Sequence, residues 1–78
     1  MTRYFFDVRE GDFVAADDNG MPLQNVNEAL KTARAAAAEI AGDVFRTGNT
    51  DRVTVEVRDD KKKIGRVTVC IKAETFDP

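Results

Sequence analysis

Histidine is absent from the sequence and cysteine occurs once, at Cys70. The chain therefore lacks the commonest general base and cannot assemble the thiolate and imidazole ligands of a zinc site. Cys70 lies in an alternating stretch typical of a strand, where only Arg66 and Lys72 are cationic neighbours on its face. A reactive thiol needs a helix N-terminus or cationic neighbours together with a base. We expect a strand cysteine without a catalytic role.

Five carboxylates gather in the first part of the chain, at Asp7, Glu10, Asp12, Asp17 and Asp18. Such hard oxygen ligands suit Ca²⁺. However, the run from Asp17 to Gly20 lacks the length and the terminal glutamate of an EF-hand loop, and aspartates are ordinary turn residues. Paired carboxylates can also hydrolyse glycosides, but a short chain with half of its sheet exposed offers no evident cleft. The sequence therefore predicts no metal, no cofactor and no enzymatic activity.

Length and charge bound the remaining possibilities. The chain has 78 residues, of which 33% are charged, and its formal net charge is −2. This length predicts one domain over residues 1–78, and the acidic balance argues against general affinity for polyanions. Charges interrupt every apolar run, so no membrane span is expected. Residues 1–3 lead straight into a predicted strand without the pattern of a signal peptide, which predicts a cytoplasmic location.

Residues 25–48 form the only candidate helix. Asn25 is a good N-cap, Glu28 completes a capping box, and Gly48 suits the left-handed position after the last turn. Gly42 interrupts the pattern, and we expect it to serve close packing or a local bend. Small residues on the apolar stripe predict a helix lying close to a sheet. Apolar residues recur at steps of three and four at Val26, Leu30, Ala33, Ala37, Ile40 and Val44, and Ala29, Ala36, Ala41 and Phe45 widen the stripe.

Four stretches alternate as strands do, at residues 3–9, 13–16, 52–58 and 66–74. Two hairpins therefore flank the helix in the order ββαββ. The helix returns the chain, so the third strand runs parallel to the second and antiparallel to the first. The predicted fold is α+β, with a four-stranded antiparallel sheet in the order 2-1-3-4 and one helix on one face. The alternative order 1-2-3-4 would place a parallel pair in the middle.

The face of the sheet away from the helix is predicted to be basic although the chain is acidic. Such an open sheet can bind single-stranded RNA, but that mode needs stacking aromatics and only Phe5 qualifies. The alternative is a solvated face with cross-strand ion pairs. The predicted cations are Arg3, Arg9, Arg52, Arg58, Arg66 and Lys72, against the acids Asp7, Glu56 and Glu74, and the candidate interaction residues are Phe5, Arg58, Arg66, Thr68, Cys70 and Lys72.

Several short motifs occur along the chain at Arg3-Tyr4-Phe5-Phe6, Gly11, Asp17 with Gly20, Leu23, Asn25, Ala29, Ala33, and Val55-x-Val57-x-Asp59. Together they resemble a family of short bacterial proteins, mostly alphaproteobacterial, that begin with Arg-Tyr-Phe-Phe and are known only as a domain of unknown function. The resemblance covers most of the chain and implies no activity, cofactor or partner. Where that family often has arginine and glutamate on the first helical turns, this chain has Leu30 and Thr32.

The fourth predicted strand is expected to be an edge, since it is the last element. Its segment 67–71 reads VTVCI, without proline or charge, and Arg66 and Lys72 only flank it. Unpaired edge groups invite another strand, so we expect a homodimer through antiparallel pairing of this edge with itself. The alternative is a monomer whose edge is covered by the tail around Phe76. The predicted function is a non-enzymatic structural or protein-interaction module that self-associates; the alternative is a weak nucleic-acid-binding module.

Overall fold

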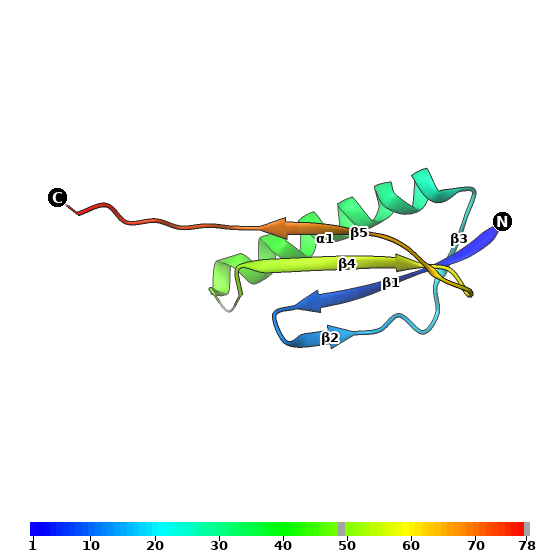
Figure 1. Cartoon of the computed structure of the whole chain (residues 1–78), viewed down its shortest axis with the longest axis horizontal. Coiled ribbons are helices and arrows are strands. Elements are labelled where there is room, and N and C mark those ends of the chain that lie inside the picture. Colours follow the sequence, from blue (N-terminus) through cyan, green and yellow to red (C-terminus); the bar gives the residue numbers. More distant parts are fainter. Residues whose placement is uncertain (49, 78) are drawn as a thin grey trace.

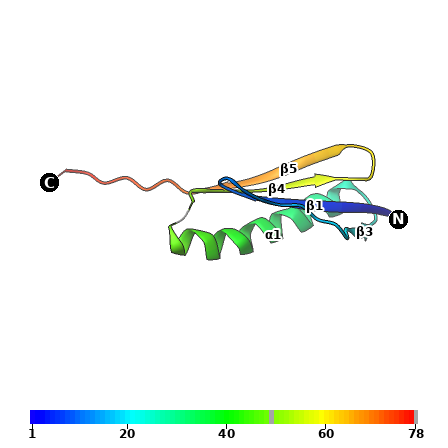
Figure 2. The same ribbon diagram turned by 90° about the horizontal axis from the view of Figure 1, so that it is seen from below.

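The computed structural model describes residues 1–48 and 50–77. In these residues one helix covers one face of an antiparallel sheet, which confirms the predicted α+β class (Figures 1 and 2). The helix is α1 (Val26–Thr47), and the strands are β1 (Thr2–Glu10), β2 (Phe13–Ala15), β3 (Met21–Leu23), β4 (Arg52–Arg58) and β5 (Lys63–Cys70). The path β2-β1-β4-β5 follows the predicted order, and β3 adds a fifth strand that was not predicted.

The helix is positioned by its ends as the sequence indicates. Asn25 has extended backbone angles, and its side chain accepts a hydrogen bond from the Glu28 amide at 2.9 Å. Gly48 ends the helix in the left-handed region, with φ of 74°. The close packing expected at Gly42 is wrong, because an added Cβ there would meet nothing within 4 Å outside the helix backbone.

Replacing Asn25 by alanine is expected to lower the free energy of unfolding by about 1 kcal/mol, the usual cost of losing an N-cap. The Glu28 amide would lose its acceptor while the rest of the helix kept its contacts. Chemical denaturation followed by circular dichroism measures the change. Asn27→Ala is the matched control, because it makes the same substitution at an exposed position two residues further along the chain. Equal stability of wild type and Asn25→Ala would mean that the cap contributes nothing in this fold.

The core lies between one row of the helix and the inner face of the sheet. The buried helix residues are spaced by four, so they form a single row of small side chains (Ala29, Ala33, Ala37 and Ala41). Across from them Val53, Val55 and Val57 of β4 are fully buried, and Tyr4 of β1 is 5% exposed. Each fully buried valine contributes roughly 1.5–3 kcal/mol of transfer free energy. The small residues of the core come from the helix and the large ones from the strands, although Val26 of the predicted stripe is 41% exposed and lies outside the row.

The boundaries of the last strand differ from the prediction of residues 66–74. β5 begins earlier, at Lys63, and ends at Cys70. The turn before it is tighter than expected because the Asp59 carboxylate accepts hydrogen bonds from the amides of Lys61 and Lys62, both at 2.8 Å. The ladder continues past Gly65 to Lys63, with a bulge where the register shifts between Val57 and Arg58. These residues have the sequence character of a loop.

Strands β2 and β3 pair with the same edge of β1 and are separated by a loop. β2 pairs with Val8, Arg9 and Glu10, and β3 pairs with Thr2, Arg3 and Tyr4. Between them, residues 5–7 of β1 face the longer segment 16–20. β3 escapes sequence analysis because it has only three residues and includes Pro22, which lacks a ladder donor and is tolerated only at an edge.

Candidate functional site

Register places the predicted interaction residues on one face but in separate cross-strand rows. Phe5 lies opposite Arg58, which in turn lies opposite Lys63. Arg66, Thr68 and Cys70 lie opposite Glu56, Thr54 and Arg52 respectively. Lys72 lies beyond the end of β5, where it pairs with Glu74 at 3.0 Å, so these two residues do not belong to the sheet face as predicted. The structure therefore divides the candidate residues into a group around Arg58 and a group along β5.

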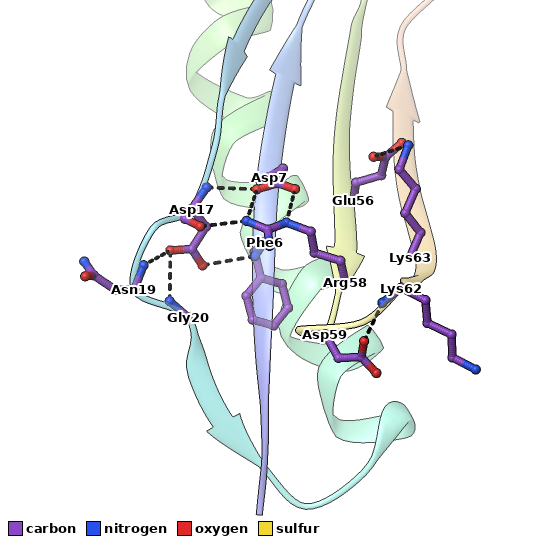
Figure 3. A network of polar contacts seen from close by, with 10 residues as sticks. All are labelled: Phe6, Asp7, Asp17, Asn19, Gly20, Glu56, Arg58, Asp59, Lys62 and Lys63. Carbon is purple, nitrogen blue, oxygen red and sulfur yellow. Dashed lines mark hydrogen bonds and ion pairs between the residues drawn. The ribbon is translucent and has the colours of Figure 1, made fainter.

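Arg58 closes a polar network across the sheet (Figure 3). Its Nε donates to Asp7 Oδ2 at 2.8 Å, and its Nη2 donates to the Asp17 carbonyl oxygen at 2.9 Å. The Asp17 amide donates to Asp7 Oδ1 at 2.8 Å. The guanidinium also lies 4.5 Å from the ring centroid of Phe5. Arg58 is thus committed to internal partners, which a free ligand-binding arginine would not be.

The Asp17 carboxylate completes the same network from the loop between β2 and β3 (Figure 3). Its Oδ2 accepts from the Phe6 amide at 3.0 Å, and its Oδ1 accepts from the amides of Asn19 and Gly20 at 3.0 and 3.1 Å. The Phe6 amide points away from β4 at the point where neither β2 nor β3 pairs with β1. Asp17 therefore satisfies a ladder donor that the loop would otherwise leave without an acceptor.

Both carboxylates are stabilised in their ionised form. Burial alone would raise the pKa of Asp7, but the hydrogen bonds from Arg58 and the Asp17 amide outweigh it and hold that pKa below its usual value. Burial likewise opposes ionisation of Asp17, but the amides of Gly20, Phe6 and Asn19 lower its pKa. Neither carboxyl group has the raised pKa that is usual for a general acid, and both carboxylates accept hydrogen bonds within the domain.

The arrangement around Phe5 bears on the nucleic-acid alternative. Base stacking needs an accessible aromatic face, and the Arg58 guanidinium already lies over this ring. Two further cations, Lys63 and Arg66, lie 3.6 and 3.7 Å from the Glu56 carboxylate, so part of the positive charge of the face is neutralised.

We expect no binding of single-stranded RNA tighter than about micromolar at physiological salt, because the total charge is negative and the Arg58 guanidinium already occupies one face of the Phe5 ring. Fluorescence anisotropy with labelled oligonucleotides at two salt concentrations measures this. A nanomolar affinity that falls steeply with salt and is lost in Phe5→Ala would reverse the conclusion. Phe13→Ala, which removes an exposed aromatic of β2, is the matched control.

The free edge of β5 is the second candidate site. Within the described residues β5 ends the sheet path and pairs only with β4. The Ile71 amide donates to the Asp51 carbonyl oxygen at 2.9 Å, so Ile71 and Asp51 form a hydrogen-bonded pair. Hydrogen-bonded and non-hydrogen-bonded residue pairs alternate along an antiparallel ladder. Val67 and Val69 therefore bond to β4, while the backbone groups of Arg66, Thr68 and Cys70 point outward. This edge has neither proline nor a bulge between residues 66 and 70 to discourage pairing.

The C-terminal segment leaves this edge open. Residues 71–77 run away from the body of the domain as an extended chain (Figures 1 and 2). Phe76 is 84% exposed, so it does not cover β5 as the monomeric alternative requires. The thiol of Cys70 is exposed on the same strand.

Across residues 1–48 and 50–77 no group of three or more His, Cys, Asp or Glu side chains is placed to hold a metal ion. The one helix that the structure describes, α1, lacks the apolar length needed to cross a membrane.

The Asp7–Arg58–Asp17 network was missed as a unit by sequence analysis. Asp7 and Arg58 are 51 positions apart, and only the β1–β4 register brings them together. The available signal was the aspartate-x-x-glycine spacing of Asp17 and Gly20, together with the outward positions of Asp7 and Arg58 on neighbouring strands.

The fold and these sites define a small α+β domain with one helix on an antiparallel sheet. The polar network of Asp7, Asp17 and Arg58, called the polar clasp below, ties the loop between β2 and β3 to the sheet, and β5 is an open edge. Residues 3–70 match the family described as Domain of unknown function (DUF6894), and the chain belongs to this family. Searches of curated proteins and of solved structures find no match. The match confirms the predicted membership of a domain of unknown function, and it supplies no activity.

Proposed function

We propose that this protein is a non-enzymatic interaction module that associates with a second copy of itself through the edge of β5. The observation that carries the proposal is the outward direction of the backbone groups of Arg66, Thr68 and Cys70 along a regular strand. Each such group regains a hydrogen bond when another strand adds to the sheet.

The chemistry of the edge favours a second copy as the added strand. Pairing a strand with itself in antiparallel fashion forms a two-fold interface, the commonest symmetry among oligomers. The side chains of β5 suit this arrangement, because Val67 and Val69 lie on the helix side of the sheet while Thr68 and Cys70 lie on the open side. When two copies pair along this strand, the valines of one copy extend the apolar surface of the other. On the open side, the uncharged side chains of Thr68 and Cys70 lie near the interface.

A non-enzymatic role is supported by how the reactive groups are used. Asp7 and Asp17, with Arg58, are engaged with one another and with backbone groups. The exposed thiol of Cys70 suits a reducing compartment, so we place the working location in the cytoplasm of a bacterium, in keeping with the family resemblance.

Light scattering at micromolar concentration is expected to give twice the 8.6 kDa mass of one chain for the wild type and the mass of one chain for Thr68→Pro. Proline removes an amide that points away from β4, so the internal ladder survives while an intermolecular donor is lost. Circular dichroism checks that Thr68→Pro is folded.

Thr68→Val is the matched control, because it keeps the backbone amide and only removes the hydroxyl that contacts Thr54 at 3.1 Å. This control should remain dimeric. A monomeric wild type at micromolar concentration would overturn the proposal. A folded Thr68→Pro protein that stays dimeric would place the interface elsewhere.

A further inference from the structure

Resting on the proposed self-association, we infer that residues 71–74 of each copy form the strand that pairs with β5 of the other copy. In this arrangement Cys70 lies opposite Cys70 of the second copy. The two chains exchange their C-terminal segments reciprocally, and each sheet gains one strand.

The C-terminal segment continues the geometry of β5. The Ile71 amide still bonds to Asp51, so the ladder alternation extends past the end of the strand. Lys72 and Glu74 contact each other at 3.0 Å, which places their side chains on one side of the segment, as alternation requires. Residues with even numbers from Arg66 to Glu74 therefore present their backbone groups along one continuous edge, half of it beyond the body of the domain (Figure 1).

Any two-fold register centred on a residue from Thr68 to Lys72 keeps the outward-pointing backbone groups of both chains paired, and these registers differ in length. A register centred on Thr68 pairs Arg66 with Cys70 and stops there, because the bulge near Gly65 interrupts the alternation. A register centred on Cys70 runs from Arg66 to Glu74 in each chain. It forms about ten intermolecular backbone hydrogen bonds, against about six for the Thr68 register.

Charge separates the same registers. Centring on Cys70 places Arg66 opposite Glu74 of the second copy, twice by symmetry, and Lys72 opposite the neutral Thr68. Centring on Lys72 places that lysine opposite its own symmetry mate, which is unfavourable for like charges directly across a ladder. Centring on Val69 would place Arg66 opposite Lys72 of the second copy, and centring on Ile71 places no opposite charges across from each other. Among these registers, the Cys70 register is therefore the one that sets opposite charges directly across the ladder.

The helix-side residues agree with this register. Val69 faces Ile71 of the second copy and Val67 faces Ala73, as non-hydrogen-bonded pairs in which side chains lie closest. Ile71 is 49% exposed in the single chain. Strand exchange covers this apolar side chain. The segment that extends from the single chain then serves as the strand that pairs with the second copy.

A charge exchange tests the pairing of Arg66 with Glu74. Arg66→Glu and Glu74→Arg are each expected to weaken the dimer by at least about tenfold, since two pairs per dimer change from attraction to repulsion. The double variant should restore the affinity to within about threefold of wild type. Sedimentation equilibrium measures the dissociation constant. The rescue separates an intermolecular effect from loss of the internal Arg66–Glu56 contact, which the double variant does not recover.

Arg34→Glu is the charge-matched control. It makes the same change in net charge on an exposed helix residue away from the edge and should leave the dissociation constant unchanged. A dimer whose affinity is unaffected by Arg66→Glu, or a double variant no tighter than the singles, would overturn the inferred register.

Cysteine cross-linking tests the centre of the register. A short bismaleimide is expected to link two wild-type chains through Cys70. It should not link the Thr68→Cys, Cys70→Ser variant, in which the two cysteines would be about 14 Å apart along the strands. The opposite pattern in a dimeric protein would refute the Cys70 register and leave the proposed edge pairing intact. A monomer by sedimentation would overturn both proposals.

Discussion

Replacing Asp17 by alanine is expected to lower the free energy of unfolding by about 3 kcal/mol. The side chain accepts hydrogen bonds from the amides of Phe6, Asn19 and Gly20, and the Phe6 amide lies in a half-buried gap of the ladder. A donor left without an acceptor costs roughly 1–3 kcal/mol, and bonds to a charged acceptor are the stronger kind. In a domain of this size such a loss corresponds to a fall in Tm of roughly 15 °C.

Asp18→Ala is the matched control for this variant. It makes the same change in charge one residue further on, where the side chain is exposed, and it should alter the free energy of unfolding by less than about 0.5 kcal/mol. Urea denaturation of both variants beside the wild type gives the comparison. Equal losses in the two variants would show that general charge, rather than the acceptor geometry of Asp17, stabilises the loop.

Acid provides an independent readout of the same carboxylate. The pKa of Asp17 is lowered in the folded protein, so its contribution to stability is complete above the unfolded value of about 4 and is lost as pH falls through the lower folded value. The difference in stability between wild type and Asp17→Ala is therefore expected to be constant from pH 7 to about pH 5 and to shrink below about pH 4. A difference that does not narrow in acid would contradict the ionised form as the stabilising one.

The helix and the order of the main strands could be predicted because their signals are local. Asn25 and Gly48 mark the ends of α1 through their own side chain and backbone preferences. The alternation around Val55 and in β1 gives the inward face directly. Antiparallel order then follows from one helix returning the chain between two hairpins.

The polar clasp and β3 could not be predicted because they depend on register. Arg58 reaches Asp7 only because Phe5 and Arg58 are opposite each other across β1 and β4. β3 has few residues and one proline, so its pairing is decided by the loop that precedes it and not by its own propensity. The early start of β5 has the same origin, since the hairpin turn is closed by the Asp59 side chain.

The polar clasp also occupies two residues of the open sheet face that were predicted to bind a partner. On sequence alone Phe5 and Arg58 were candidate interaction residues, and in the structure they contact each other and the loop. The network joins Asp7 of β1 and Arg58 of β4 to the loop between β2 and β3, where Asp17 accepts a hydrogen bond from the Gly20 amide. The edge of β5 is eight residues long, whereas β2 at the other edge of the described sheet has three residues, and the proposed function depends on this longer edge.

Gly20→Ala is expected to be as damaging as the loss of Asp17, by about 3 to 4 kcal/mol. Gly20 has φ of 71°, where an alanine costs about 1 kcal/mol. An added Cβ would also lie 2.8 Å from Arg3 Cγ, 2.9 Å from Phe5 Cε1 and 2.9 Å from the Tyr4 carbonyl oxygen. The arginine can move aside, but the carbonyl belongs to the β1 backbone, so the loop must shift and strain its contacts with Asp17.

Gly48→Ala separates the two causes. Gly48 has a similar φ of 74°, but an added Cβ would meet nothing within 4 Å. This control should therefore cost only about 1 kcal/mol, the conformational part. The difference of roughly 2 to 3 kcal/mol between the two variants, measured by urea denaturation, is the part due to close approach of the loop to β1. Equal costs would mean that the loop can move away from β1 freely, and the clasp of Asp7, Asp17 and Arg58 would then not hold it in place.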